Sequence, residues 1–66
     1  MKYIVIITTE AYGADEEWNS ESLQAATDYA KELQAEANAG YYGGAKTPVG
    51  FSVRVEDQNG WGVWNC

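Results

Sequence analysis

The stretch KYIVIITT at residues 2–9 gives the strongest strand signal in the chain, and the predicted fold is built outward from it. It is rich in isoleucine, valine and threonine, the β-branched residues that favour extended backbone. Its alternating faces are both apolar, with Tyr3, Val5 and Ile7 on one and Ile4 and Ile6 on the other. The pattern therefore predicts a strand covered on both faces, or covered on one face and adhesive on the other.

A helix is predicted after a loop over residues 10–19 that contains Gly13. Asn19, Ser20 or Ser22 can each cap the first free N–H groups, so the helix is expected to begin between residues 20 and 22. Gly40 suits the left-handed position that follows a helix, so the helix is expected to end at residues 38–40. Apolar residues recur at helical spacing on one face, at Leu23, Ala26, Ala30, Leu33 and Ala37.

The last third of the chain predicts a β-hairpin. A glycine-rich loop over residues 41–48 precedes an alternating strand over residues 49–56, in which Val49, Phe51, Val53 and Val55 share a face. Asn59-Gly60 is a strong hairpin signal, and residues 61–66 form the return strand. A two-residue turn would pair Gln58 with Trp61, Glu56 with Val63 and Val55 with Trp64. Trp64 and Cys66 would then face the helix, with Trp61 and Val63 on the other face; a longer turn would change this register.

These elements predict one α+β domain over residues 1–66 with the order β-α-β-β. One helix is expected to pack on one face of a three-stranded antiparallel sheet. The strand over residues 61–66 is expected to lie beside the first strand.

The charge of the chain limits its partners. Four basic residues against ten acidic ones give a net charge of −6. Direct binding to DNA, RNA or anionic lipid is not expected, because those ligands select basic surfaces. A basic protein surface is the expected partner. The single cysteine, Cys66, and the lack of a long apolar run or targeting segment favour a reducing cytoplasm over a membrane.

The residues needed for common enzyme chemistry are missing from the sequence. There is no histidine, and no Cys-x-x-Cys or Ser-His-Asp arrangement. The glycines of residues 40–44 follow a helix, whereas a phosphate-binding loop precedes one. The sequence therefore predicts a non-enzyme with no metal and no cofactor.

A row of carboxylates on the predicted helix is the main candidate site. Glu21, Asp28, Glu32 and Glu36 fall within about one quadrant of a helical wheel, opposite the apolar stripe. A solvated helix face is the ordinary alternative. Two like-charge pairs four residues apart cost about 0.2–0.5 kcal/mol each, and this unfavourable pattern favours a function for the charge.

The acidic run Asp15, Glu16 and Glu17 is expected to lead into the N-terminal end of the same helix. Trp18 and Tyr29 border the row and could anchor a partner, or could simply pack at the edge of the core. Such a row can compete for the arginine and lysine side chains that hold phosphates.

Two further surfaces are candidates for contact with a partner or a second copy. Trp61 and Val63, with one apolar set of the first strand, would form an apolar patch on the uncovered sheet face. Tyr41 and Tyr42 could form an adaptable loop contact, or belong to a plain connection. The alternative to an acidic inhibitor is therefore a small homodimeric accessory or interaction module.

The sequence also resembles a group of tiny phage and mobile-element proteins. The resemblance lies in Tyr3–Ile7, in Ser22-Leu23-x-x-Ala26 with Ala30, in Val53–Asp57 with Asn59-Gly60, and in the final Trp64. Some proteins of this group are anti-CRISPR proteins that bind type I surveillance complexes and keep target DNA out. The resemblance implies a β-α-β-β plan and an inhibitor acting in the cytoplasm of a bacterial host.

Overall fold

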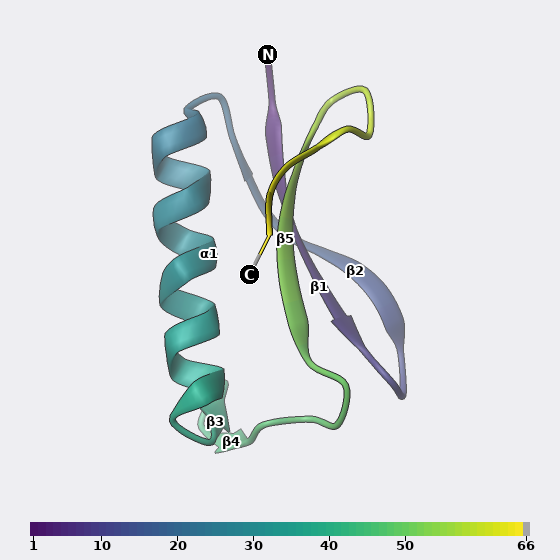
Figure 1. Cartoon of the computed structure of the whole chain (residues 1–66), viewed down its shortest axis with the longest axis vertical. Helices are drawn as coiled ribbons and strands as arrows, with labels where there is room; N and C mark the ends of the chain where they lie inside the picture. Colours follow the sequence, from purple (N-terminus) through teal and green to yellow (C-terminus); the bar gives the residue numbers. More distant parts are fainter. Residues whose placement is uncertain (66) are drawn as a thin grey trace.

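The computed structural model describes residues 1–65, so the predicted place of Cys66 lies outside the described residues. Four strands form the antiparallel main sheet in the order β2-β1-β5-β6, and two short strands form a separate hairpin. The helix covers one face of the main sheet (Figure 1). The elements in chain order are β1 (Tyr3–Thr9), β2 (Gly13–Ser20), α1 (Leu23–Asn38), β3 (Tyr41–Tyr42), β4 (Ala45–Lys46), β5 (Ser52–Asp57) and β6 (Gly62–Asn65).

The main sheet has four strands, where the sequence predicted three. The added strand is β2, which occupies most of the segment predicted as a loop and pairs with β1 along its length. Its sequence GADEEWNS is rich in acidic residues, which rarely favour strands. Every residue of β2 except Ser20 is exposed, so the carboxylates keep their hydration while the backbone pairs with β1.

The predicted strand order was wrong, because β5 and not β6 lies beside β1. Val5 stands directly opposite Val55, and both side chains are fully buried under α1. This pairing places the two most apolar strands at the centre of the sheet. Since β2 and β5 both run antiparallel to β1, they are parallel to each other, and α1 connects them in a split β-α-β arrangement.

The structure confirms Ser22 as the N-cap and the predicted end of α1, while the helix begins at Leu23, one residue after the predicted range. The Ser22 hydroxyl accepts a hydrogen bond from the Ala25 N–H at 3.1 Å, as an N-cap does. After the helix, Gly40 adopts a positive φ of 98°, and its N–H donates to the Ala37 carbonyl at 3.0 Å. The Thr47 hydroxyl donates to the same carbonyl at 2.9 Å, which fastens the β3–β4 hairpin to the end of α1.

The core lies between α1 and the central strands. Ala26, Ala30, Leu33 and Ala37 are buried as predicted, whereas Leu23 is 42% exposed at the first turn. On the sheet side the buried residues are Val5, Ile7, Val53 and Val55. Val49 was predicted to share their face, but it precedes β5 in an irregular segment and is 73% exposed.

The β5–β6 hairpin confirms one predicted pair and corrects another. Val55 is opposite Trp64, but Glu56 is opposite Gly62 and not Val63, so the ladder is bulged. The Asp57 carboxylate accepts hydrogen bonds from the Asn59 and Trp61 N–H groups at 2.9 and 3.1 Å. Gly60 has a φ of 86°, which suits a three-residue loop and its bulge better than the predicted two-residue turn.

Candidate functional site

The acidic row of α1 is exposed along its length. Glu21 precedes the helix, and Asp28, Glu32 and Glu36 lie on its solvent side; all four are exposed. Asp28 accepts a hydrogen bond from the Gln24 side chain at 2.9 Å. Within residues 1–65 the one ion pair joins Arg54 to Glu56, far from this row. The carboxylates of α1 are therefore not neutralised by described basic residues.

The acidic run at the start of β2 is divided between the two faces of the sheet. Asp15 is paired with the buried Ile7, so it lies on the face that α1 covers. Glu16 is paired with Ile6 on the open face, where it accepts a hydrogen bond from the Asn19 amide at 3.1 Å. A register shift then leaves Glu17 without a partner on β1.

Two aromatic residues connect β2 to α1. The rings of Trp18 and Tyr29 stack with their centroids 4.9 Å apart and their planes 30° from parallel. Tyr29 is half-buried against the core, while Trp18 remains 39% exposed. Burial raises the pKa of Tyr29, and the charges of Glu17, Glu32 and Glu36 raise it further. The two acidic groups of residues therefore influence the same side chain, on the same side of the molecule.

The predicted position of the acidic run relative to α1 needs correction. The run was expected at the N-terminal end of the helix, but β2 runs back along it before the chain enters α1 (Figure 1). Glu17 instead influences Tyr42, which follows the C-terminal end of α1. Burial raises the pKa of Tyr42, and the Glu17 charge adds to the effect, with a smaller contribution from Glu36.

A hollow of about 210 Å³ lies between the β1–β2 hairpin and the segment after α1. The Asp15 and Glu17 carboxylate residues lie on one wall, and Ile7, Tyr42 and Pro48 supply apolar surface. Its volume is below the roughly 300–1,000 Å³ of small-molecule sites. The hollow combines a short apolar lining with negative charge, an environment that suits the stem and head of one basic side chain.

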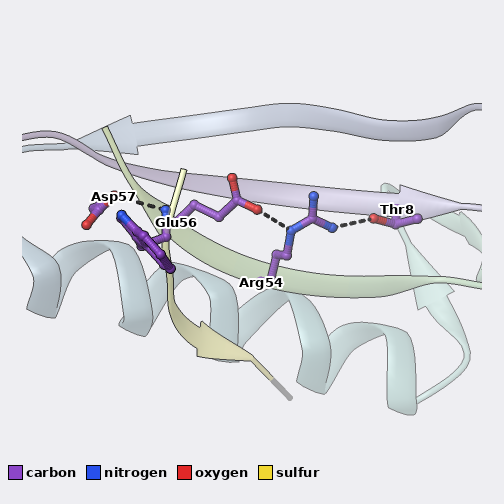
Figure 2. A network of polar contacts seen from close by, with 5 residues as sticks. Thr8, Arg54, Glu56 and Asp57 are labelled. Atoms are coloured by element: carbon purple, nitrogen blue, oxygen red, sulfur yellow. Dashed lines mark hydrogen bonds and ion pairs between the residues drawn. The ribbon is translucent and has the colours of Figure 1, made fainter. Parts of the chain in front are cut away.

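Arg54 and Glu56 form an ion pair on the open face of the sheet. Arg54 Nε donates to Glu56 at 2.7 Å, and Arg54 Nη1 donates to the Thr8 hydroxyl at 3.1 Å (Figure 2). Ile4 and Ile6 lie on this face and are half-buried, so strand β1 is covered on one face only. Ile4 stands opposite Glu56 and Ile6 opposite Arg54, so each isoleucine has a charged neighbour on the next strand.

The second group of predicted contact residues does not form one surface. Trp61 is 72% exposed and Val63 is 41% exposed, at the hairpin and in the outer strand β6. Tyr41 is 64% exposed in the small hairpin. Tyr42 packs against the core, with its ring 4.9 Å from that of Phe51, so it is a structural residue more than a free loop contact.

Sequence reasoning found the acidic row of α1 but missed the hollow. The hollow requires Asp15 and Glu17 to share a side while Glu16 points away, and this depends on the β1–β2 register. A possible signal was Tyr12-Gly13 after a strand, since Gly13 has a φ of 73° in the turn that starts β2.

Two general features of the described chain complete the description of the site. Among residues 1–65, no three or more histidine, cysteine or acidic side chains are grouped so as to hold a metal ion. Over the same residues, no helix has the length and the apolar character that are needed to cross a membrane.

A scan against protein-family models, a search of curated proteins and a search of solved structures each find no match to this chain.

Proposed function

We propose that this chain is a protein inhibitor that binds a basic, nucleic-acid-holding surface of its partner through the acidic side of α1. The observation that supports this is the exposure of Glu21, Asp28, Glu32 and Glu36 without an ion pair to any described basic residue. Carboxylates on a rigid helix can form charge-assisted hydrogen bonds with arginine and lysine, as phosphates do. The stacked Trp18 adds an exposed aromatic surface beside the row.

The partner that we propose is a type I CRISPR-Cas effector complex in the cytoplasm of a bacterial host. The support for this identity is the sequence resemblance to small phage proteins, of which some are anti-CRISPR proteins. Such complexes hold target DNA on basic surfaces, and those surfaces complement a chain with a net charge of −6. Inhibition then requires no catalysis, because occupation of the basic surface keeps the DNA out.

The test measures binding of target DNA to a purified type I complex in the presence of the chain. At low salt, the Glu32→Gln/Glu36→Gln variant should associate with the complex at least about tenfold more slowly than the unmodified chain, since opposite charges accelerate encounter. The matched control is Glu10→Gln/Glu16→Gln, which changes the net charge equally but away from α1. Equal rates for the two variants would reject α1 as the binding surface. Absence of binding to any type I complex would reject this partner. It would leave open the proposal that α1 binds a basic surface of another protein.

A second candidate function is a homodimeric interaction module that uses the open sheet face. The observation in its favour is that Ile4 and Ile6 are only half-buried on that face, and that Trp61 and Val63 of the β5–β6 hairpin are exposed. This candidate predicts a mass that rises with concentration in sedimentation experiments and falls after Trp61→Ala. A monomer at all concentrations removes it.

A further inference from the structure

The strand β2 has one paired edge and one free edge. It is the outermost strand of the sheet beside β1, and it extends over eight residues, Gly13–Ser20. The free edge of a strand presents unpaired N–H and C=O groups that can accept another strand. The register shift near Glu17 interrupts the ladder, so this edge has two regular stretches, of which the longer covers residues 13–16.

The hollow described above lies along this regular stretch. Gly13 and Asp15 line it from β2, and Glu17 follows them. Side chains of neighbouring strands that stand side by side project to the same face. A strand added beside β2 would therefore place every second side chain on the side of the sheet that holds the hollow.

The charges on β2 identify the kind of strand that fits. A second copy of β2 would bring its own Asp15, Glu16 and Glu17 against the same three residues, and like charges on adjacent strands are destabilising. No described basic residue forms an ion pair with these carboxylates. A basic segment is complementary to both the edge and the hollow.

We propose that the free edge of β2 binds an extended segment of another protein with lysine or arginine at alternating positions, and that one such side chain enters the hollow beside Asp15 and Glu17. The apolar stem of the side chain contacts Ile7 and Pro48, and its charged head meets the carboxylates. Backbone hydrogen bonds give affinity, and the hollow gives preference for a basic residue.

This inference goes beyond the proposed function because it uses β2 and a peptide ligand instead of the outer face of α1. The two can fail separately. A basic segment can add to β2 whether or not α1 occupies a nucleic-acid-binding surface.

The experiment uses three synthetic peptides with blocked ends. The first alternates arginine with valine, the second replaces each arginine with glutamate, and the third has the arginines of the first but proline at every valine position. Binding is followed by backbone amide chemical shifts and by hydrogen exchange of the full chain. We expect the first peptide to shift and protect amides of residues 13–17. We expect the second and third to bind at least about tenfold more weakly, because one lacks the positive charge and the other lacks the N–H donor at every second residue and has proline φ angles that disfavour a paired strand.

A pair of matched variants locates the binding surface. Asp15→Asn/Glu17→Gln should weaken the first peptide about tenfold, as expected for the loss of hydrogen bonds to charged groups. Glu32→Gln/Glu36→Gln has the same change in net charge on α1 and should weaken it less than about threefold. Circular dichroism checks that both variants remain folded.

Three results would each overturn the proposal. The first is equal binding of the proline peptide, which would mean that only charge is recognised. The second is amide shifts that lie on α1 and leave residues 13–17 unchanged. The third is equal weakening by the two double variants.

Discussion

The two sides of the main sheet differ in how their charged residues are accommodated. On the open side, Arg54 is held between Glu56 and Thr8, so two of its N–H groups have acceptors within the fold. On the side of α1, the carboxylates of Glu21, Asp28, Glu32 and Glu36 are exposed and have no ion pair with a described residue. The first set of charges therefore contributes to the fold, whereas the second set is available to solvent or to another molecule.

The largest expected difference between the two sides concerns neighbouring isoleucines of β1. Ile7 is 5% exposed under α1, whereas Ile6 is half-buried on the open side. Ile7→Ala should lower the free energy of unfolding by about 2–5 kcal/mol, because it removes buried methyl groups and leaves a cavity. Ile6→Ala should cost about 1–2 kcal/mol, since part of this side chain already contacts water. Urea denaturation of both variants measures the difference.

The milder pair Ile7→Val and Ile6→Val serves as a check if Ile7→Ala does not fold, since a small domain has a narrow margin of stability. Equal costs at the two positions would contradict the comparison. They would mean that the open side is covered in solution, as in the homodimer considered above.

The next expected effect concerns the paired charges of the open side. Arg54→Ala removes the ion pair with Glu56 and the hydrogen bond to Thr8, and the pair is partly exposed to solvent. The expected loss is about 0.5–1 kcal/mol, the upper part of the range for such pairs. Lys31→Ala is the control, because Lys31 is exposed on α1 and forms no ion pair with a described residue. Thermal or urea denaturation should show a change below about 0.5 kcal/mol for this control.

The helix was predictable from the sequence because its signals are local. The Ser22 cap, the alanine stripe and Gly40 lie within or next to the segment that they define. The exposed position of Glu32 and Glu36 followed directly, since a helix with one buried side must present the other to solvent.

The strand β2 was not predictable in the same way. Its residues Asp15–Glu17 have low strand propensity, and their extended state depends on pairing with β1. Strand alternation separates Asp15 and Glu17 from Glu16, but which of them faces α1 depends on the pairing of Asp15 with Ile7. Long-range pairing of this kind leaves no periodic signal in a short charged segment, so Tyr12-Gly13 could indicate the turn before β2 but not the acidic lining of the hollow.

On the side of α1, a substitution that reduces charge should raise stability. Glu32 stands four residues from both Asp28 and Glu36, and each like-charge pair costs about 0.2–0.5 kcal/mol. Glu32→Gln should therefore raise the free energy of unfolding by about 0.4–1 kcal/mol at low salt. The gain should shrink as salt screens the repulsion. Urea denaturation at two salt concentrations measures both effects.

The control for this prediction is Glu10→Gln, which removes one exposed charge outside α1. A loss of stability in Glu32→Gln, or a gain that does not depend on salt, would indicate that Glu32 has a favourable partner. The contrast between the two sides of the sheet would then be wrong for this residue.

The smallest expected effect is a dependence of stability on alkaline pH. Burial, followed by the charge of Glu17, raises the pKa of both Tyr29 and Tyr42 above the ordinary value. The unfolded chain therefore releases these protons at lower pH than the folded chain does. The stability that the neutral hydroxyls provide is fully present below about pH 10, the unfolded tyrosine pKa, and is lost as pH rises through the folded value.

The Tyr29→Phe/Tyr42→Phe variant should lose less stability than the unmodified chain between about pH 9 and 11, because it lacks the two shifted groups. Tyr41→Phe is the control, since Tyr41 is exposed in the small hairpin. This variant should lose as much stability over the same pH range as the unmodified chain does. Urea denaturation across this range gives the slopes. Glu17→Gln should reduce the slope by removing a charge that acts on both rings. If Tyr29→Phe/Tyr42→Phe reduces the slope but Glu17→Gln leaves it unchanged, Glu17 does not face these two rings, and β2 and α1 do not present their carboxylates on the same side of the molecule.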